Sequence, residues 1–102
     1  MSELACNISA FPAAEREIHR RLSDALVGGA VATYDAADGL VFHLKADDCE
    51  IALRFIAIER QCCPFLQFTL EVTPDSGPIW LRIGGPPGSS AFLRDELHVP
   101  PT

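Results

Sequence analysis

The chain has 102 residues and a formal net charge of −6, with 48% apolar and 22% charged residues. This length fits a single domain over 1–102 with one core, and we expect loose termini at 1–10 and 98–102. The acidic balance disfavours nucleic acid and anionic membranes as partners, and every apolar run is far shorter than a membrane span. A cation or another protein remains a suitable partner.

The segment 1–10 has neither a basic start nor a long apolar run, so we expect no targeting segment and a cytoplasmic location. Cytoplasmic thiols stay reduced, so the four cysteines are expected to be thiols rather than two disulfides. Each cysteine is therefore a candidate thiol, and Cys6 and Cys49 are expected to be incidental.

Helical spacing dominates the first part of the chain. Pro12 suits a first-turn position, where its missing N–H costs nothing. Apolar residues recur at the spacing of one helix face at Ile18, Leu22, Ala25 and Leu26. Gly28-Gly29 predicts the end of this helix. His19 has the spacing to pair with Glu15 and is expected on the solvated face.

A first hairpin is predicted over 31–44. The two short strands, 31–34 and 40–44, flank the turn-rich segment Asp35-Ala36-Ala37-Asp38-Gly39. In the second strand Leu40, Phe42 and Leu44 share one face. His43 alternates away from that face and is a weak ligand candidate.

The second helix is expected to begin at Asp47, which with Glu50 has the spacing of a capping box. Pro64 disfavours helical geometry at the residue before it, so the helix should end at Cys63. Two stripes run along this helix. The predicted core stripe holds Ile51, Phe55, Ile58 and Cys62, and the neighbouring stripe holds Ala52, Ile56, Glu59 and Cys63.

A second hairpin follows, with alternation over 66–72, a turn at 74–78 and alternation over 79–83. Trp80 and Arg82 fall on its wet face, which indicates either an interface or a tryptophan covered by the first helix or a tail. A glycine- and proline-rich turn at 84–88 precedes a last short helix at 89–97. The order αββαββα predicts a two-layer α+β domain: about four antiparallel strands in two hairpins, with helices on one face.

The adjacent residues Cys62 and Cys63 are the feature best suited to chemistry. Two neighbouring thiolates can bind one soft ion such as Hg(II), Cu(I) or Zn(II). The paired Cys-x-x-Cys spacing of a closed zinc site is absent, so further ligands would come from Cys6, a histidine or a second subunit. Cys49 lies about 20 Å from Cys62 along a straight helix and cannot share its ion.

Three alternatives stay open for this pair. A disulfide between the neighbours would be strained, because adjacent Cα atoms are closer than disulfide geometry prefers. A nucleophilic Cys63 is disfavoured by the negative end of the helix and by Glu59, so we assign no catalytic residue. Buried cysteine also serves as a small hydrophobe, and this packing role is strongest for Cys62. Of the pair, Cys63 is expected to be the more accessible.

The segment Glu59-Arg60-Gln61-Cys62-Cys63-Pro64-Phe65, followed by Gly77-Pro78-Ile79-Trp80-Leu81, resembles small bacterial domains with a Cys-Cys-Pro-Phe signature. It is also similar to the C-terminal part of some MerR-type regulators. The resemblance spans roughly 11–97 and implies a sensor domain that answers to metals or thiol stress, with Cys62 and Cys63 as its functional residues. This chain has no room for the winged-helix part of those regulators.

The sequence therefore predicts a cytoplasmic soft-metal-binding or thiol-sensing domain that uses Cys62 and Cys63. The alternative is a protein-interaction or homodimerisation module in which the cysteines only pack. A cysteine-dependent redox enzyme is the least favoured hypothesis.

Overall fold

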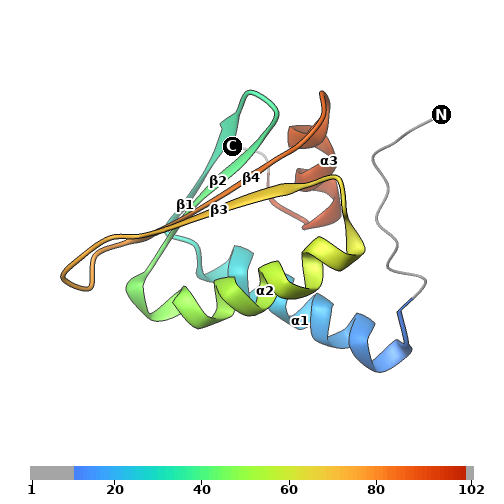
Figure 1. The fold of residues 1–102 in the computed structure, drawn as a ribbon, viewed down its shortest axis with the longest axis horizontal. Helices are drawn as coiled ribbons and strands as arrows, with labels where there is room; N and C mark the ends of the chain where they lie inside the picture. Colours follow the sequence, from blue (N-terminus) through green and yellow to red (C-terminus); the bar gives the residue numbers. More distant parts are fainter. Residues whose placement is uncertain (1–10, 101–102) are drawn as a thin grey trace.

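The computed structural model describes residues 11–100. The elements run α1 (Ala13–Gly29), β1 (Ala32–Ala36), β2 (Gly39–Leu44), a 3₁₀ turn (Ala46–Asp48), α2 (Cys49–Cys62), β3 (Gln67–Val72), β4 (Ile79–Gly84) and α3 (Ser89–Glu96). Figure 1 shows the helices stacked against one sheet. The predicted α+β class and the order αββαββα are confirmed.

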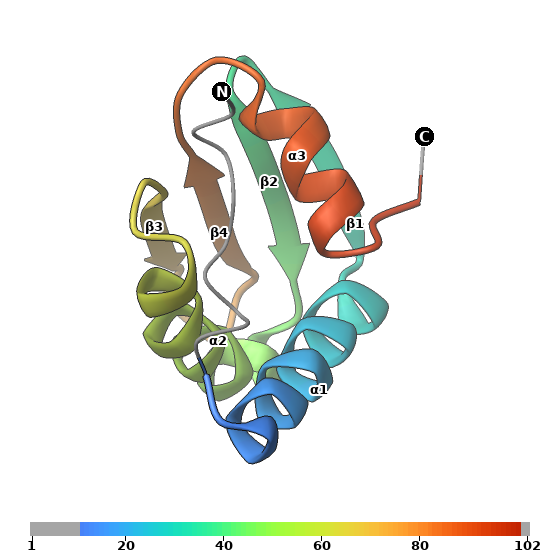
Figure 2. The same cartoon turned by 90° about the vertical axis from the view of Figure 1, so that its right-hand side faces the viewer.

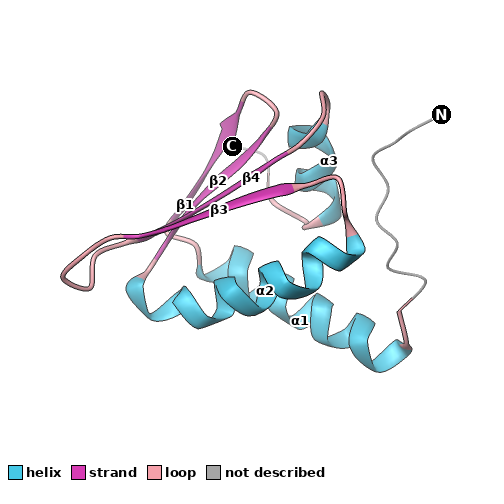
Figure 3. Ribbon diagram, in the orientation of Figure 1, coloured by secondary structure: helices cyan, strands magenta, loops and turns pink. Residues whose placement is uncertain are grey.

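The two hairpins form one antiparallel sheet with strand order β1-β2-β4-β3. The central pairing of β2 with β4 joins them, and it places Phe42 opposite Leu81. β1 and β3 are therefore the edge strands. Figures 2 and 3 show that the three helices lie on the same side of this sheet, which leaves its other face without a helix.

Strand alternation determines which side chains enter the core. The inward residues of the two central strands are no more than 2% exposed: Leu40, Phe42, Leu44, Ile79, Leu81 and Ile83. Phe55 of α2 and Leu93 of α3 cover them and are fully buried. Each large apolar side chain buried in this way stabilises the fold by roughly 1.5–3 kcal/mol.

The buried face of α1 differs from the prediction. Ile18 is 42% exposed and Ala25 is exposed, whereas His19 is only 8% exposed. The helix packs mainly against α2 rather than flat on the sheet, and this contact selects His19, Leu22, Ser23 and Leu26 as its buried residues. The expectation of a solvated His19 paired with Glu15 is wrong.

The second helix also departs from its predicted register. The 3₁₀ turn takes up residues 46–48, Asp48 is the N-cap, and no side chain caps the helix, so the predicted capping box is not formed. The buried residues of α2 are Ala52, Phe55, Glu59 and Cys62. Because α2 lies between the sheet and α1, parts of both predicted stripes are covered.

The end of the described chain is held to the fold. Val99 is 6% exposed, and its backbone N–H donates to the carbonyl of Arg94 at 2.8 Å. The expectations for 1–10 and 101–102 lie outside the described residues. Within 11–100, no helix combines the length and the apolar character needed to cross a lipid bilayer.

Candidate metal centre

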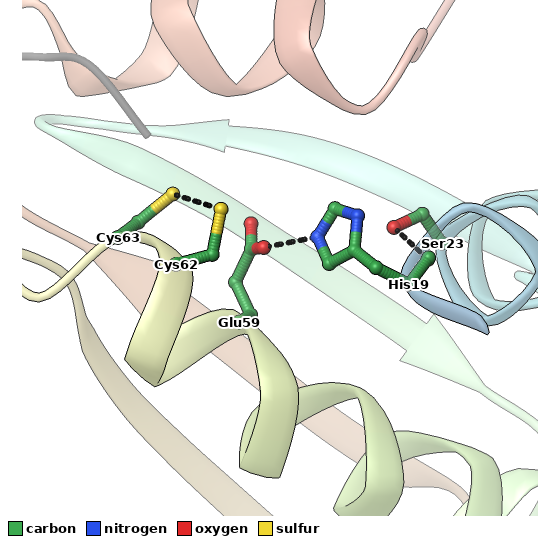
Figure 4. A network of polar contacts seen from close by, with 5 residues as sticks. All are labelled: His19, Ser23, Glu59, Cys62 and Cys63. Carbon is green, nitrogen blue, oxygen red and sulfur yellow. Dashed lines mark hydrogen bonds and ion pairs between the residues drawn. The ribbon is translucent and has the colours of Figure 1, made fainter. Parts of the chain in front are cut away.

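Three potential metal ligands meet in the core between the first two helices. His19 comes from α1, and Glu59 and Cys62 come from adjacent turns of α2. One ligand atom from each lies within 4.8 Å of the others, and all three residues are buried. Figure 4 shows the three side chains in one row, with Glu59 in the middle. We call this group the His-Glu-Cys cluster.

His19 and Glu59 form the tightest contact of the cluster. His19 Nε2 donates to Glu59 Oε1 at 2.6 Å, since a carboxylate only accepts. The side chains are 10% and 0% exposed, respectively. The imidazole also lies against Phe55, with ring centroids 6.5 Å apart. Packing and hydrogen bonding therefore hold the ring in one position.

The second oxygen of Glu59 has a different environment. Glu59 Oε2 is buried and has no hydrogen-bond partner within the described residues. Figure 4 shows this oxygen on the side of the carboxylate that faces the Cys62 sulfur. A buried acceptor without a donor is costly, and a charged one is more so. A cation between Glu59 and Cys62 would remove this cost.

The two adjacent cysteines are both completely buried. The expectation that Cys63 is the more accessible of the two is therefore wrong. Their Sγ atoms are 3.8 Å apart and turn toward one another in Figure 4, so this is a contact rather than a bond. Cys63 has φ −124° and ψ 78°, so the backbone leaves the helix before Pro64 and lets both sulfurs turn the same way.

The oxidation state of Cys63 also differs from the prediction. Cys63 is disulfide-bonded in this structure, which corrects the expectation that every cysteine is a thiol. Cys63 can thus serve as a metal ligand only after reduction. Cys6, the other suggested ligand, lies outside the described residues. Cys49 opens α2 and Cys62 closes it, so the predicted separation of these two sulfurs is confirmed.

Sequence reasoning missed two members of the cluster. Glu59 stands one helical turn before Cys62, a spacing that places both on one face of α2. His19 stands three residues before Leu22 and seven before Leu26, which is the spacing of a buried stripe. The spacing of His19 from Glu15 favoured a solvated pair instead, and nothing in the sequence indicates that α1 lies beside α2.

The other weak candidates lie away from the cluster. His43 stacks on Trp80 with ring centroids 4.5 Å apart, and both belong to the sheet face that carries no helix. Trp80 is therefore not covered by α1. Gly84 closes β4, and residues 85–88 form a loop leading into α3, as predicted for a turn.

The charges of the cluster shift the pKa of one carboxyl group outside it, that of Glu96. The pKa of Glu96 on α3 is raised, first by burial and next by the negative charge of Glu59, while His19 acts in the opposite direction. Glu96 is half-buried. Glu96 on α3 is therefore a second carboxylate within electrostatic reach of the cluster, besides Glu59.

Comparison with protein families, curated proteins and solved structures finds no match to this chain. The resemblance to Cys-Cys-Pro-Phe domains consequently stays a prediction. Chemically, the cluster offers one nitrogen, one or two oxygens and one sulfur, a donor set that can hold a divalent metal ion.

Proposed function

We propose that this protein is a cytoplasmic metal-binding domain whose ion is held by His19, Glu59 and Cys62. The observation that carries the proposal is the buried, unsatisfied Glu59 Oε2 inside a group of three ligand-type side chains. Apolar residues would fill this part of the core more favourably, so a buried polar group here calls for a functional explanation.

The donor set favours Zn(II) among the ions predicted from the sequence. Hg(II) and Cu(I) select sulfur, whereas Zn(II) accepts sulfur, imidazole nitrogen and carboxylate oxygen together. Nitrogen and oxygen ligands of a tetrahedral zinc are about 3.3 Å apart, given bonds of about 2.0–2.1 Å. The 2.6 Å contact of His19 with Glu59 would open on binding, and the ion would replace the hydrogen between them.

Reduced Cys63 is our proposed fourth ligand. Two thiolates on a tetrahedral zinc are about 3.8 Å apart for Zn–S bonds of about 2.3 Å. The 3.8 Å between the sulfurs of Cys62 and Cys63 suits that geometry. The ion would then respond to the oxidation state of Cys63, which is the thiol-sensing part of the proposal. Burial of every ligand favours binding and sensing over catalysis.

Metal titration of the reduced full chain tests the proposal. Zn(II), Hg(II) and Cu(I) are added in turn, and Co(II) serves as a spectroscopic probe because thiolate-to-cobalt charge transfer reports sulfur ligation. We expect one Zn(II) per chain. Cys62→Ser, Glu59→Gln and His19→Asn should each weaken zinc affinity by roughly tenfold or more, since even residues behind the ligands cost 10–100-fold.

Matched controls use residues of the same type outside the cluster. Cys49→Ser removes a half-buried sulfur from the far end of α2, and His98→Asn removes an exposed imidazole; both should bind like the parent. Circular dichroism establishes that each variant is folded. The proposal fails if the parent binds no ion, or if folded Cys62→Ser shows the same affinity and the same Co(II) charge-transfer band.

We also propose, as a second candidate function, that the helix-free sheet face forms a homodimer interface. This face carries the His43–Trp80 stack, and beside it Tyr34 is 50% exposed. Aromatic residues next to Arg82 suit the core of an interface. Sedimentation equilibrium tests the idea. The parent should dimerise, Tyr34→Glu should be monomeric, and Leu53→Glu, which charges an equally exposed residue of α2 (54%), should still dimerise. A monomeric parent excludes this function.

A further inference from the structure

We infer that metal reaches the His-Glu-Cys cluster through the cleft between α1 and α3, and that Glu96 is the residue that captures the ion on the way. This inference rests on the proposed metal-binding function. It adds the route of the ion and a residue that governs the rate of loading.

The cleft has a volume of about 560 Å³ and is lined by residues of α1 and by 95–98 at the end of α3. His19 forms part of its lining. The His19 side chain is 10% exposed, while Glu59 and Cys62 are 0% exposed. His19 is thus the one cluster member with surface toward solvent, and this cleft is where that surface lies.

The charges of the cleft leave Glu96 available for a cation. On α1, Arg20 lies 3.7 Å from Asp24, and Glu17 accepts from Arg21 at 3.1 Å. Glu96 forms no ion pair within residues 11–100, and it is half-buried in the lining of the cleft. Arg16, the other arginine of the lining, donates to the carbonyl of Phe11 at 2.8 Å. The Glu96 carboxylate is therefore less hydrated than a surface carboxylate, and within the described residues the imidazoles of His19 and His98 are the groups that oppose its raised pKa.

The electrostatic link to Glu59 supports this assignment. Burial raises the pKa of Glu96 most, and the charge of Glu59 raises it further, so the two carboxylates repel one another. A divalent cation between them removes this repulsion. Acidic groups at the mouth of a pocket also raise the local cation concentration and the rate of association. Because Glu96 lies outside the His-Glu-Cys cluster, it should influence the rate at which the ion enters and leaves rather than the final affinity for the ion.

Stopped-flow loading of the reduced full chain with Zn(II) measures this role directly, and chelator-driven release measures the reverse step. We expect Glu96→Gln to slow loading and release by the same factor, about tenfold, and to leave the dissociation constant within about twofold of the parent. Glu50→Gln makes the same change of charge on the exposed start of α2, and it should leave both rates unchanged.

Each other outcome contradicts a defined part of the scheme. If Glu96→Gln loads at the parental rate, or slows no more than Glu50→Gln, the access route is wrong while metal binding stands. If Glu96→Gln raises the dissociation constant by about tenfold without slowing loading, Glu96 is a ligand and not an uptake residue. A parent chain that binds no zinc overturns the proposed function itself, and the route with it.

Discussion

Glu59 is a carboxylate with no exposed surface in the middle of an apolar core. One of its oxygens accepts from His19 at 2.6 Å, and the other has no partner within the described residues. Removing charges from water costs several kcal/mol per ion, and only good geometry with full hydrogen bonding offsets that cost. The half-satisfied Glu59 therefore lowers the stability of the fold.

The His19–Glu59 pair gives a stability prediction that does not depend on metal. His19→Leu leaves the Glu59 carboxylate buried without its donor, so the free energy of unfolding should fall by about 3–5 kcal/mol. The double variant His19→Leu/Glu59→Met replaces the whole pair with apolar groups. It should lower the free energy of unfolding by less than His19→Leu does. Urea denaturation with a chelator present measures both.

His98→Asn is the control for this cycle, because His98 is exposed and asparagine tolerates its left-handed backbone (φ 57°). This replacement should change stability by less than about 0.5 kcal/mol. The cycle is completed by the single variant Glu59→Met. If the double variant lowers the free energy of unfolding by as much as His19→Leu and Glu59→Met added together, the pair is not coupled and the proposed cost of an unpaired Glu59 is wrong.

At the scale of elements, β2 and β4 approach one another so closely at Gly39 that no side chain would fit there. A Cβ added at Gly39 would lie 1.9 Å from the carbonyl oxygen of Ile83. Gly39 is also buried and pairs with Gly84 across the strands. The absence of a side chain is thus required for the close approach of the two hairpins.

Alanine substitutions at two glycines should have opposite effects. Gly39→Ala pushes against backbone, so it should lower the free energy of unfolding by about 1–3 kcal/mol or more. Gly28→Ala has no atom within 4 Å of its new Cβ and lies inside α1, so it should raise stability by about 0.5–1 kcal/mol. Thermal and urea denaturation of the two variants provide the comparison; a tolerated Gly39→Ala would contradict the close approach.

A polar contact also joins the edge strand β1 to α3. Asp35 accepts hydrogen bonds from Arg94 at 2.8 Å and from Ser90 at 3.0 Å. The Arg94 hydrogen bond first, and then that of Ser90, holds the pKa of Asp35 below its ordinary value of 3.8. The contribution of this carboxylate to stability is therefore present above pH 3.8 and is lost as the pH falls through the lower, folded-state pKa.

Asp35→Asn should accordingly be less stable than the parent at pH 7, and the gap should narrow as the pH falls below 3.8. Thermal melts at a series of pH values measure this gap. Asp47→Asn removes the same charge from an exposed residue of the 3₁₀ turn and should show a smaller difference at pH 7. A gap for Asp35→Asn that does not change with pH would contradict the role of the ionised carboxylate.

At the scale of the whole molecule, the three helices cover one face of the sheet and enclose the cluster between α1, α2 and α3. The arrangement brings Glu96 close enough to Glu59 for its pKa to rise above the ordinary value of 4.5, with burial as the larger cause. A carboxyl group with a raised folded-state pKa favours the fold at low pH, and this benefit is lost as the pH rises through that pKa.

Glu96→Gln removes a carboxylate that is both desolvated and repelled. The variant should be more stable than the parent at pH 7, and the two should converge below pH 4.5, where the parent carboxyl is protonated. Melting temperatures of the metal-free proteins from pH 7 to pH 4 test this. A variant that is equally or less stable at pH 7 would show that Glu96 makes a favourable contact that outweighs its desolvation.

The order of the elements was predictable because each signal is local. Alternation over 79–83 and the turn residues before it predict a strand of a hairpin, and Pro64 predicts the end of the second helix near Cys63. The register of the buried helix faces was not predictable in the same way. Ile18 looked like a core residue and His19 like a solvated one, since periodicity alone cannot say which neighbour a helix will meet.

The sequence by itself determined the α+β class, the two hairpins and the choice of Cys62 as a candidate ligand, because periodicity, turn chemistry and residue type act over a few neighbouring positions. Only the tertiary structure decided that His19 and Glu59, forty residues apart, share a buried contact beside that sulfur. It also decided that Cys63 is buried and disulfide-bonded. These features depend on how α1 packs against α2, a long-range contact that follows from the shape of the whole core.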